Sequence, residues 1–216
     1  RKSRKFRGKQ DEMAVSAAGA AISNAALGLG DLGPRAGLFV AVGHIAFERA
    51  DIDRIMDASL QDGRVSMRRF SEDGYGSVNP LLTLRGLSKM PAYHVSTNFD
   101  IQGPYLVAYP GPGQFYLALE EAVASLRRGD IAVALVCGVA DQRNFLVEHH
   151  FARLSPPVPP ANLADAAGCL ILELEGAARA RRAPIRARLE SLRIGYRPGG
   201  GAALAEVGEK PSRRTL

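Results

Sequence analysis

Thiol and imidazole side chains are the groups in this sequence that could carry covalent, acid–base or metal chemistry. The 216 residues include two cysteines and four histidines. Cys137 and Cys169 lie inside the apolar runs IAVALVCGV and AAGCLILEL, where a free cysteine behaves as a small buried hydrophobe. No CxxC motif and no Cys/His ligand spacing occurs, so we predict no metal site and no cofactor.

The histidines give no stronger signal. His44 follows an apolar run, and His149 and His150 lie in a stretch without ligand spacing. We expect these three to be structural. Cys137 is equally unsuited to act as a nucleophile, because it lies in the middle of an apolar run and no base is placed near it by the sequence.

A sharp break offers a different kind of site. Pro110, Gly111, Pro112 and Gly113 separate an apolar run from a helix predicted at 114–128. Proline suits the first turn of a helix because its φ is fixed and its missing N–H is not needed there. The N–H groups from Gly113 onward could therefore hold a carbonyl oxygen.

The elements that must position these residues alternate between helix and strand. Helical spacing, proline starts and alanine-rich composition predict helices at 11–29, 51–60, 80–90 and 114–128. Apolar runs predict strands at 37–43, 105–109, 131–139, 168–175 and 185–194, with 92–99 extended and 62–79 a surface loop. This alternation indicates an α/β domain with helices on a mostly parallel sheet.

The composition, 46% hydrophobic and 23% charged, is that of a globular protein. We expect a cytoplasmic protein without a membrane span, because no apolar run approaches ~18 residues and no signal-type stretch follows the basic N-terminus. The net charge of +6 gathers mainly at 1–9 and 179–197. Such runs usually form solvated surfaces, or they attract an acidic partner. Nucleic acid is not expected, because no known nucleic-acid-reading motif appears in the sequence.

Several stretches, in order, resemble the β-ketoacyl synthase family. Residues 79–96 (NPLLTLRGLSKMPAYHVS), 99–104 (FDIQGP), 126–135 (LRRGDIAVAL) and 165–173 (DAAGCLILE) are similar to the family phrases ending in NMPA-HVS, FGIRGP, IRxGxADVAL and GAGVLVLE. The likeness covers roughly 1–195 and is most specific over 79–139. His94 lies in the family's own HVS segment, so we expect it to pack.

The resemblance implies one thiolase-like half of a synthase, in which helices pack on a mixed five-stranded sheet. We expect this domain over 1–198, followed by a flexible polar tail at 199–216. The opening strand of the fold normally precedes the point where this sequence begins. The family's two catalytic histidines come from a C-terminal half that we expect to be missing here.

Ketosynthase chemistry needs a thiolate where a strand bends into a helix. An ungapped alignment places Pro112 at that position, and a two-residue slip places Gln114 there. Neither forms a thioester, so we predict no catalytic residue. Inactive members called chain-length factors pair with an active synthase and shape the tunnel for the acyl chain. The resemblance makes the residues around the turn acyl-channel candidates: Tyr109, Pro110, Gly111, Pro112, Gly113, Gln114, Phe115 and Tyr116.

The resemblance also implies two partner surfaces. The strand before the turn packs across the family's dimer interface, and the matching residues here are Tyr105, Leu106, Val107, Ala108 and Tyr109. A basic segment of the family docks acidic acyl carrier protein, and Arg4, Lys5, Arg7 and Lys9 match it in character. We therefore expect acyl carrier protein and a full-length ketosynthase as partners, in a homo- or heterodimer.

The predicted function is that of a non-catalytic β-ketoacyl synthase-like protein of fatty-acid or polyketide biosynthesis. Two alternatives stay open. One is an active acyltransferase of the 3-oxoacyl synthase type that uses an unrecognised nucleophile. The other is a stand-alone binding or scaffold module.

Overall fold

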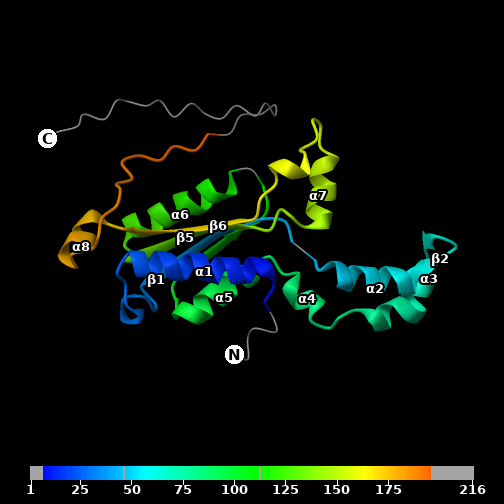
Figure 1. Ribbon diagram of the computed structural model, residues 1–216. Helices are drawn as coiled ribbons and strands as arrows, with labels where there is room; N and C mark the ends of the chain where they lie inside the picture. Colours follow the sequence, from blue (N-terminus) through cyan, green and yellow to red (C-terminus); the bar gives the residue numbers. More distant parts are fainter. Residues whose placement is uncertain (1–6, 46, 112, 196–216) are drawn as a thin grey trace.

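The computed structural model describes residues 7–45, 47–111 and 113–195, which form a sheet with helices on both faces (Figure 1). The strands are β1 (Ala36–Val42), β2 (Leu60–Gln61), β3 (Arg64–Val65), β4 (Tyr105–Ala108), β5 (Val133–Ala140) and β6 (Ala166–Glu173). The α-helices are α1 (Lys9–Asn24), α2 (Arg49–Ser59), α3 (Met67–Arg69), α4 (Leu82–Arg85), α5 (Met90–Phe99), α6 (Gln114–Arg128), α7 (Phe145–Ala152) and α8 (Glu175–Ala180). Shorter turns of helix are η2 (Leu29–Asp31), η3 (Phe70–Gly74), η4 (Tyr75–Ser77) and η5 (Pro160–Asn162). The domain boundary expected near residue 198 lies outside the described residues.

The strand order of the main sheet is β4–β1–β5–β6. β1 lies parallel to both of its neighbours, so that Leu38 is opposite Tyr105 of β4 and Leu135 of β5. β6 runs antiparallel to β5, and Cys137 faces Cys169 in that ladder. Because β1, β4 and β5 are parallel neighbours, their carboxyl ends meet at one edge of the sheet, where α/β proteins commonly bind ligands.

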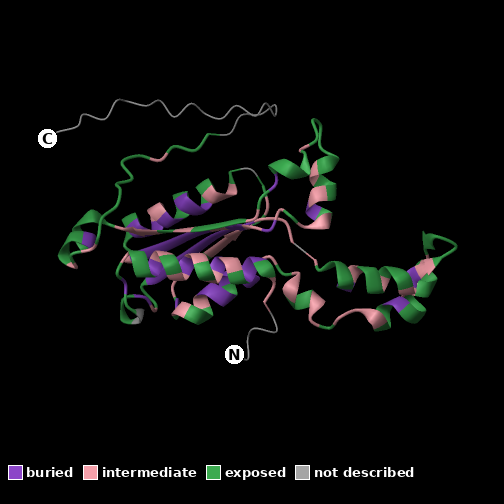
Figure 2. Ribbon diagram, viewed as in Figure 1, coloured by how far each residue is buried: buried purple, intermediate pink, exposed green. Residues whose placement is uncertain are grey.

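Helices cover both faces of the sheet. On one face, α1 and α5 pack against alternate residues of β1 and β5, while α6 packs on the other face against Phe39, Ala134 and Val136 (Figure 1). Every residue of β1 is buried as a result (Figure 2). Coverage on both faces is the physical reason that β1 and β5 are continuous apolar runs instead of alternating ones.

Small residues allow α1 to approach α5 and the sheet. Ala14 and Ala18 are fully buried, and Gly19 lies so near the ring of Phe99 that a Cβ at position 19 would come within 3.2 Å of it. At the start of the helix, the N–H of Gly8 donates to Asp11 Oδ2 over 2.7 Å. The predicted alanine-rich helix is confirmed, although it ends at Asn24 and not near residue 29.

The main sheet has four strands, so the expected five-stranded sheet is wrong. The strand predicted at 185–194 pairs with no described strand. Leu192 of this segment packs against the apolar cluster around α6, and Arg188 lies 2.7 Å from Glu175 in an ion pair. An extended segment becomes a strand only when a neighbour satisfies its backbone N–H and C=O groups, and this one lacks such a neighbour within the described chain.

Three further expectations differ from the structure. The helix expected at 80–90 is limited to α4 (Leu82–Arg85), and α5 begins only at Met90. Residues 92–99, expected to be extended, belong to α5, which has Pro91 in its first turn and ends where Asp100 takes a φ of +52°. The polar segment 62–79 is not a plain loop, because it carries β3, α3, η3 and η4. Together with α2, these elements project from the body of the molecule (Figure 1). None of the helices in the described ranges is long and apolar enough to cross a membrane.

Candidate functional site

Residues that follow the three parallel strands meet at the carboxyl edge of the sheet. His44 follows β1, the turn at 109–113 follows β4, and Asp141 follows β5. Tyr109 connects the first two segments, because the N–H of Ile45 donates to its Oη over 3.2 Å. The predicted strand, turn and helix are therefore present, and they lie at the edge where a ligand site is expected.

The turn between β4 and α6 changes direction at a glycine. Gly113 has a φ of +87°, a left-handed conformation that glycine adopts readily, and its carbonyl accepts the N–H groups of Tyr116 and Leu117 at the start of α6. Gln114 lies close to Gly111, where a Cβ would come within 3.0 Å of the Gln114 Nε2. Pro112, at the predicted nucleophile position, lies outside the described residues. No described residue of this turn carries a sulfur atom.

The aromatic residues around the turn lie in different surroundings. Phe115 packs in the core against Gly138, where a Cβ would come within 3.2 Å of the ring. Tyr116 is exposed, and its ring meets that of Phe115 edge-on with 6.1 Å between the centroids. Tyr109 is also partly exposed. These three side chains do not surround one described cavity, so their predicted role as channel walls stays a prediction.

Both cysteines lie in the β5–β6 ladder and not at the turn. Cys137 is buried on the α1 face of the sheet, Cys169 is half-buried, and their sulfur atoms are 2.7 Å apart. The neighbouring Cys137 thiol and burial raise the pKa of the Cys169 thiol far above its ordinary value. Because the thiolate is the nucleophilic form, Cys169 is poorly suited to covalent catalysis.

Two histidines meet at the carboxyl edge, which the sequence did not predict. The ring centroid of His44 lies 4.8 Å from that of His150 in α7 and 5.9 Å from that of Phe151. Burial, followed by the charge of His150, lowers the pKa of His44. The start of α7 is fixed because Asn144 Oδ1 accepts the N–H of Leu146 over 3.1 Å. A lowered pKa favours the neutral form of His44, which can accept a proton.

The fourth histidine, His94, is buried between α5 and α1, so the expectation that it packs is confirmed. Its Nε2 lies 3.8 Å from Asp11 Oδ2. Burial raises the pKa of Asp11, while the hydrogen bond from Gly8 and the nearby His94 partly oppose this change. The pair joins the two helices on this face of the sheet.

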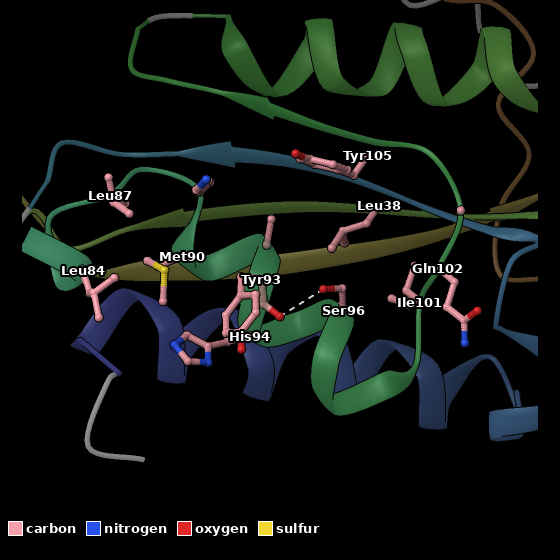
Figure 3. A pocket seen from close by; sticks show the side chains of 13 residues that line it. Leu38, Leu84, Leu87, Met90, Tyr93, His94, Ser96, Ile101, Gln102 and Tyr105 are labelled. Atoms are coloured by element: carbon pink, nitrogen blue, oxygen red, sulfur yellow. Dashed lines mark hydrogen bonds between the residues drawn. The ribbon is translucent and has the colours of Figure 1, made fainter. Parts of the chain in front are cut away.

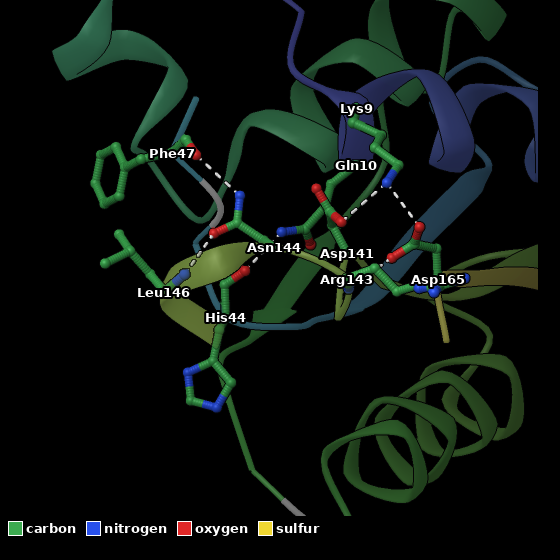
Figure 4. Close-up of polar contacts among 9 residues, drawn as sticks. All are labelled: Lys9, Gln10, His44, Phe47, Asp141, Arg143, Asn144, Leu146 and Asp165. Atoms are coloured by element: carbon green, nitrogen blue, oxygen red, sulfur yellow. Dashed lines mark hydrogen bonds and ion pairs between the residues drawn. The ribbon is translucent and has the colours of Figure 1, made fainter. Parts of the chain in front are cut away.

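A polar cluster holds the start of α1 against the end of β5 and the start of β6 (Figure 4). Lys9 Nζ lies 3.1 Å from Asp141 Oδ1 and 2.6 Å from Asp165 Oδ2, and the N–H of Arg143 donates to Asp165 Oδ1 over 2.9 Å. Beside it, Gln10 Nε2 donates to the carbonyl of His44 over 2.6 Å. We call the set Lys9, Asp141, Asp165 and Arg143 the lysine clamp.

The two carboxyl groups of the lysine clamp differ in their proton affinity. The hydrogen bond from Lys9, with that from the Arg143 N–H, lowers the pKa of Asp165 to about 2. Burial raises the pKa of Asp141, although its hydrogen bond to Lys9 opposes this change. The hydrogen bond to Asp165 is also the main cause that raises the pKa of Lys9. Sequence reasoning assigned Lys9 to partner docking and missed its bonds within the chain.

Of the other predicted docking residues, Arg7 lies in the described chain. Its Nη2 donates to Asn98 Oδ1 over 3.0 Å at the surface, so Arg7 lies beside the end of α5. Arg4 and Lys5 lie outside the described residues. Their predicted contact with an acidic partner stays a prediction.

An open cavity of about 870 Å³ lies beside α4, α5 and the edge strand β4 (Figure 3). Its walls are mainly apolar and include Leu38, Leu84, Leu87, Met90, Ile101 and Tyr105. Lys89, Ser96 and Gln102 supply polar groups. Tyr105, a predicted dimer-strand residue, is 68% exposed. Among the described strands, β4 pairs only with β1. An apolar hollow beside such a strand edge is suited to an apolar ligand or to a protein partner.

The described residues contain no cluster of three or more His, Cys, Asp or Glu side chains that could hold a metal ion. The carboxyl edge holds the histidine pair, the Tyr109 hydroxyl and the Asp141 carboxylate. The lysine clamp has no free carboxylate pair for acid–base work, because Lys9 binds both carboxylates.

Comparison with solved structures identifies the fold. It is similar to a chain in the solved complex of a type II polyketide synthase acyl carrier protein with its ketosynthase bound to the hexaketide. The TM-score is 0.67 and the identity is 16%, over 84% of this chain and 51% of that chain. It is also similar to the ishigamide ketosynthase/chain length factor, with a TM-score of 0.58 and 21% identity over 83% of this chain and 45% of that chain. A β-ketoacyl synthase from Burkholderia phymatum is similar with a TM-score of 0.61 and 18% identity, over 85% of this chain and 46% of that chain. No protein-family model and no curated protein matches the sequence.

This chain has the thiolase-like fold of the ketosynthases. It spans about half the length of each of these three solved chains.

Proposed function

We propose that this chain is a non-catalytic ketosynthase-like component of fatty-acid or polyketide assembly, working with an acyl carrier protein and a full-length ketosynthase. One observation carries the proposal. The turn between β4 and α6 reads Pro110-Gly111-Pro112-Gly113-Gln114, which includes no thiol, while both cysteines lie in the β5–β6 ladder.

The chemistry of acyl transfer explains why this observation matters. A ketosynthase holds its acyl group as a thioester, and the attacking sulfur must be a thiolate at an accessible position. The raised pKa of Cys169 disfavours its thiolate, and Cys137 is buried in the centre of the sheet. A retained scaffold without a thiol at the turn is consistent with binding, not with covalent catalysis.

The solved structures with this fold support the choice of partners. One of them contains a ketosynthase with its acyl carrier protein, and another contains a chain length factor. The exposed edge of β4 and the apolar cavity beside it offer this chain a surface that a synthase subunit or a second copy would cover.

The decisive experiment is an attempt to acylate the protein. We expect the intact mass of the chain to stay unchanged after incubation with acyl- or malonyl-loaded carrier protein, because no activated thiol is present at the turn. An active ketosynthase treated in parallel should gain the acyl mass. An acyl adduct mapped by peptide analysis to any side chain of this protein would disprove the non-catalytic assignment.

Carrier-protein docking is tested by charge reversal at the N-terminal basic segment. The double variant Arg4→Glu/Lys5→Glu should weaken carrier-protein binding about tenfold or more at low salt, and the difference should shrink as salt screens the charges. Lys9 is left intact, because reversing its charge would break the lysine clamp. Arg54→Glu/Arg64→Glu, an exposed double change on α2 and β3 that alters the net charge equally, is the matched control. Equal binding by the double variant and the control would exclude this docking site.

The His44–His150 pair favours a second candidate, an acyltransferase with an unrecognised nucleophile. His44 precedes Ile45, whose N–H donates to Tyr109 Oη, and His44 contacts His150. In its neutral form, which the lowered pKa favours, His44 could act as a base for a bound hydroxyl or water. Release of free or transferred acyl groups by the wild-type protein, and its loss in a folded His44→Gln variant, would establish this alternative. A chain that binds neither a synthase nor a carrier protein would instead be a stand-alone module.

A further inference from the structure

We propose that Cys137 and Cys169 are a redox-active pair that forms a cross-strand disulfide when the protein meets a small-molecule disulfide such as oxidised glutathione. This modification site is separate from the turn and the cavity, and it does not depend on the proposed function. It would fasten the edge strand β6 to the central strand β5.

The register of the sheet pairs the two cysteines. Cys137 and Cys169 are directly opposite each other in the antiparallel β5–β6 ladder, between the pairs Val136–Leu170 and Gly138–Gly168. Directly opposed residues have neighbouring Cβ atoms on the same face of the sheet. Both sulfurs accordingly belong to the apolar cluster on the α1 side.

The two sulfur atoms lie close together. The two Sγ atoms lie 2.7 Å apart, whereas a disulfide bond measures about 2.0 Å. Only a small movement is needed to join them, and the adjacent backbone is already paired. Cysteines that are far apart in a fold cannot be joined without moving the backbone.

Cys169 is the less buried of the two cysteines. Cys137 is 1% exposed, but Cys169 lies on β6, which has β5 as its only partner among the described strands. Its chain neighbours Gly168 and Leu170 are exposed. Cys169 is therefore the sulfur that an oxidant reaches first when the edge strand loosens, while Cys137 is held close behind it.

The reaction balances as two exchange steps. The Cys169 thiolate attacks one sulfur of oxidised glutathione, forming a mixed disulfide and releasing one glutathione thiolate. The Cys137 thiolate then attacks the Cys169 sulfur and releases the second glutathione. The two protein thiols lose two protons and two electrons, and the glutathione disulfide gains them to become two glutathione thiols.

The environment of the pair also predicts how the rate varies with pH. Each step needs a thiolate, and the pKa of the Cys169 thiol is raised by Cys137 and by burial. The reaction should accordingly be slow at neutral pH and should accelerate as the pH rises. The pair would then respond to sustained oxidation and not to brief exposure.

The experiment measures the mass of the purified 216-residue chain after exposure to oxidised glutathione, followed by unfolding and alkylation with N-ethylmaleimide. Because the sequence has two cysteines, an intrachain disulfide has a single assignment. We expect a monomer that takes up no alkylating reagent and is about 2 Da lighter than the reduced chain, as the loss of two hydrogens requires. Reduction before alkylation should restore two adducts.

Other outcomes would overturn the proposal. These are a stable bis-glutathione adduct, two thiols that remain free at high pH after long exposure, or covalent dimers in place of the monomer. The variant Cys169→Ala should give at most slow glutathione addition at Cys137. If this variant fails to fold, the wild-type mass measurement still decides the question.

A stability measurement shows whether the bond forms in the native ladder. The oxidised chain should melt roughly 5 °C or more above the reduced chain, because a native-geometry crosslink restricts the unfolded chain. A lower melting temperature after oxidation would show that the bond distorts β5 and β6 and would contradict the proposed geometry.

Discussion

At the scale of single residues, the lysine clamp shows how one side chain joins three elements. Lys9 begins α1, Asp141 follows β5 and Asp165 precedes β6. Asp141 is buried, so its charge would be costly without Lys9 beside it. The ammonium group therefore fixes the start of the first helix against the end of the antiparallel ladder.

The clamp predicts a specific dependence of stability on pH. The pKa of Asp165 falls from an ordinary value of 3.8 to about 2 in the folded protein. A lowered carboxyl pKa stabilises the folded state above about pH 4, and this contribution is lost as the pH falls toward the folded value. The variant Asp165→Asn should therefore cost about 1 kcal/mol at pH 6, the size of a solvent-screened pair and hydrogen bond, and less at acidic pH.

Urea unfolding at several pH values would measure this difference. Asp57→Asn, which removes an exposed carboxylate on α2, provides the control and should leave stability nearly unchanged. The contribution of Asp141 to folding stability depends on pH in the opposite direction. Because the pKa of Asp141 is raised in the folded protein, its contribution is lost as the pH rises through the folded pKa. Only the difference between wild type and Asp165→Asn isolates Asp165. A constant difference from pH 6 down to pH 2 would contradict the assigned role.

At the scale of elements, the approach of β4 to β1 depends on Gly103. The N–H of Gly103 donates to the carbonyl of Ala36 over 3.1 Å just before β4 begins. A Cβ at position 103 would lie 2.9 Å from the Pro34 carbonyl oxygen and would overlap that of Ala36. These are backbone atoms of the adjoining segment, so a rotamer change cannot relieve the contact.

Gly103→Ala should therefore push the start of β4 away from β1 and lower the free energy of unfolding by about 2 kcal/mol or more. Gly168→Ala in β6 is the matched control, because a Cβ there meets no atom within 4 Å. Chemical denaturation of both variants measures the difference. Equal stability of the two variants would show that the backbone beside β4 yields easily.

At the scale of the whole molecule, β4 leaves one side of the sheet open. β4 pairs only with β1 among the described strands, and Tyr105 at its start is both exposed and part of the cavity wall. Unpaired strand edges beside apolar surface readily associate with another chain. The proposed partner would complete the sheet at this edge and cover the cavity.

Tyr105→Lys should accordingly reduce capture of the partner synthase, or self-association, at least about tenfold, because lysine on an edge strand opposes pairing. Sedimentation or quantitative pull-down measures the change. Tyr75→Lys is the control, since Tyr75 is a comparably exposed tyrosine on the projecting segment. The same loss in both variants, or in neither, would place the interface elsewhere.

Much of the fold followed from local signals in the sequence. The apolar runs identified β1, β4, β5 and β6, because strands covered on both faces or packed on a helix need few polar residues. Pro110 and Gly113 identified the turn before α6, and the absence of a thiol there is a property of the sequence alone. The segment 185–194 has a strand-like composition, but no neighbour within the described chain pairs with it.

Tertiary structure decided which distant residues meet. The register of β5 against β6 pairs Ala140 with Ala166, which brings Asp141 beside Asp165 and sets Cys137 opposite Cys169. A one-residue slip would turn those side chains to the opposite face, and no local signal fixes the register of strands joined by a long connection. The sequence alone determined the missing thiol at the turn, whereas the lysine clamp, the histidine pair and the facing cysteines depend on long-range packing.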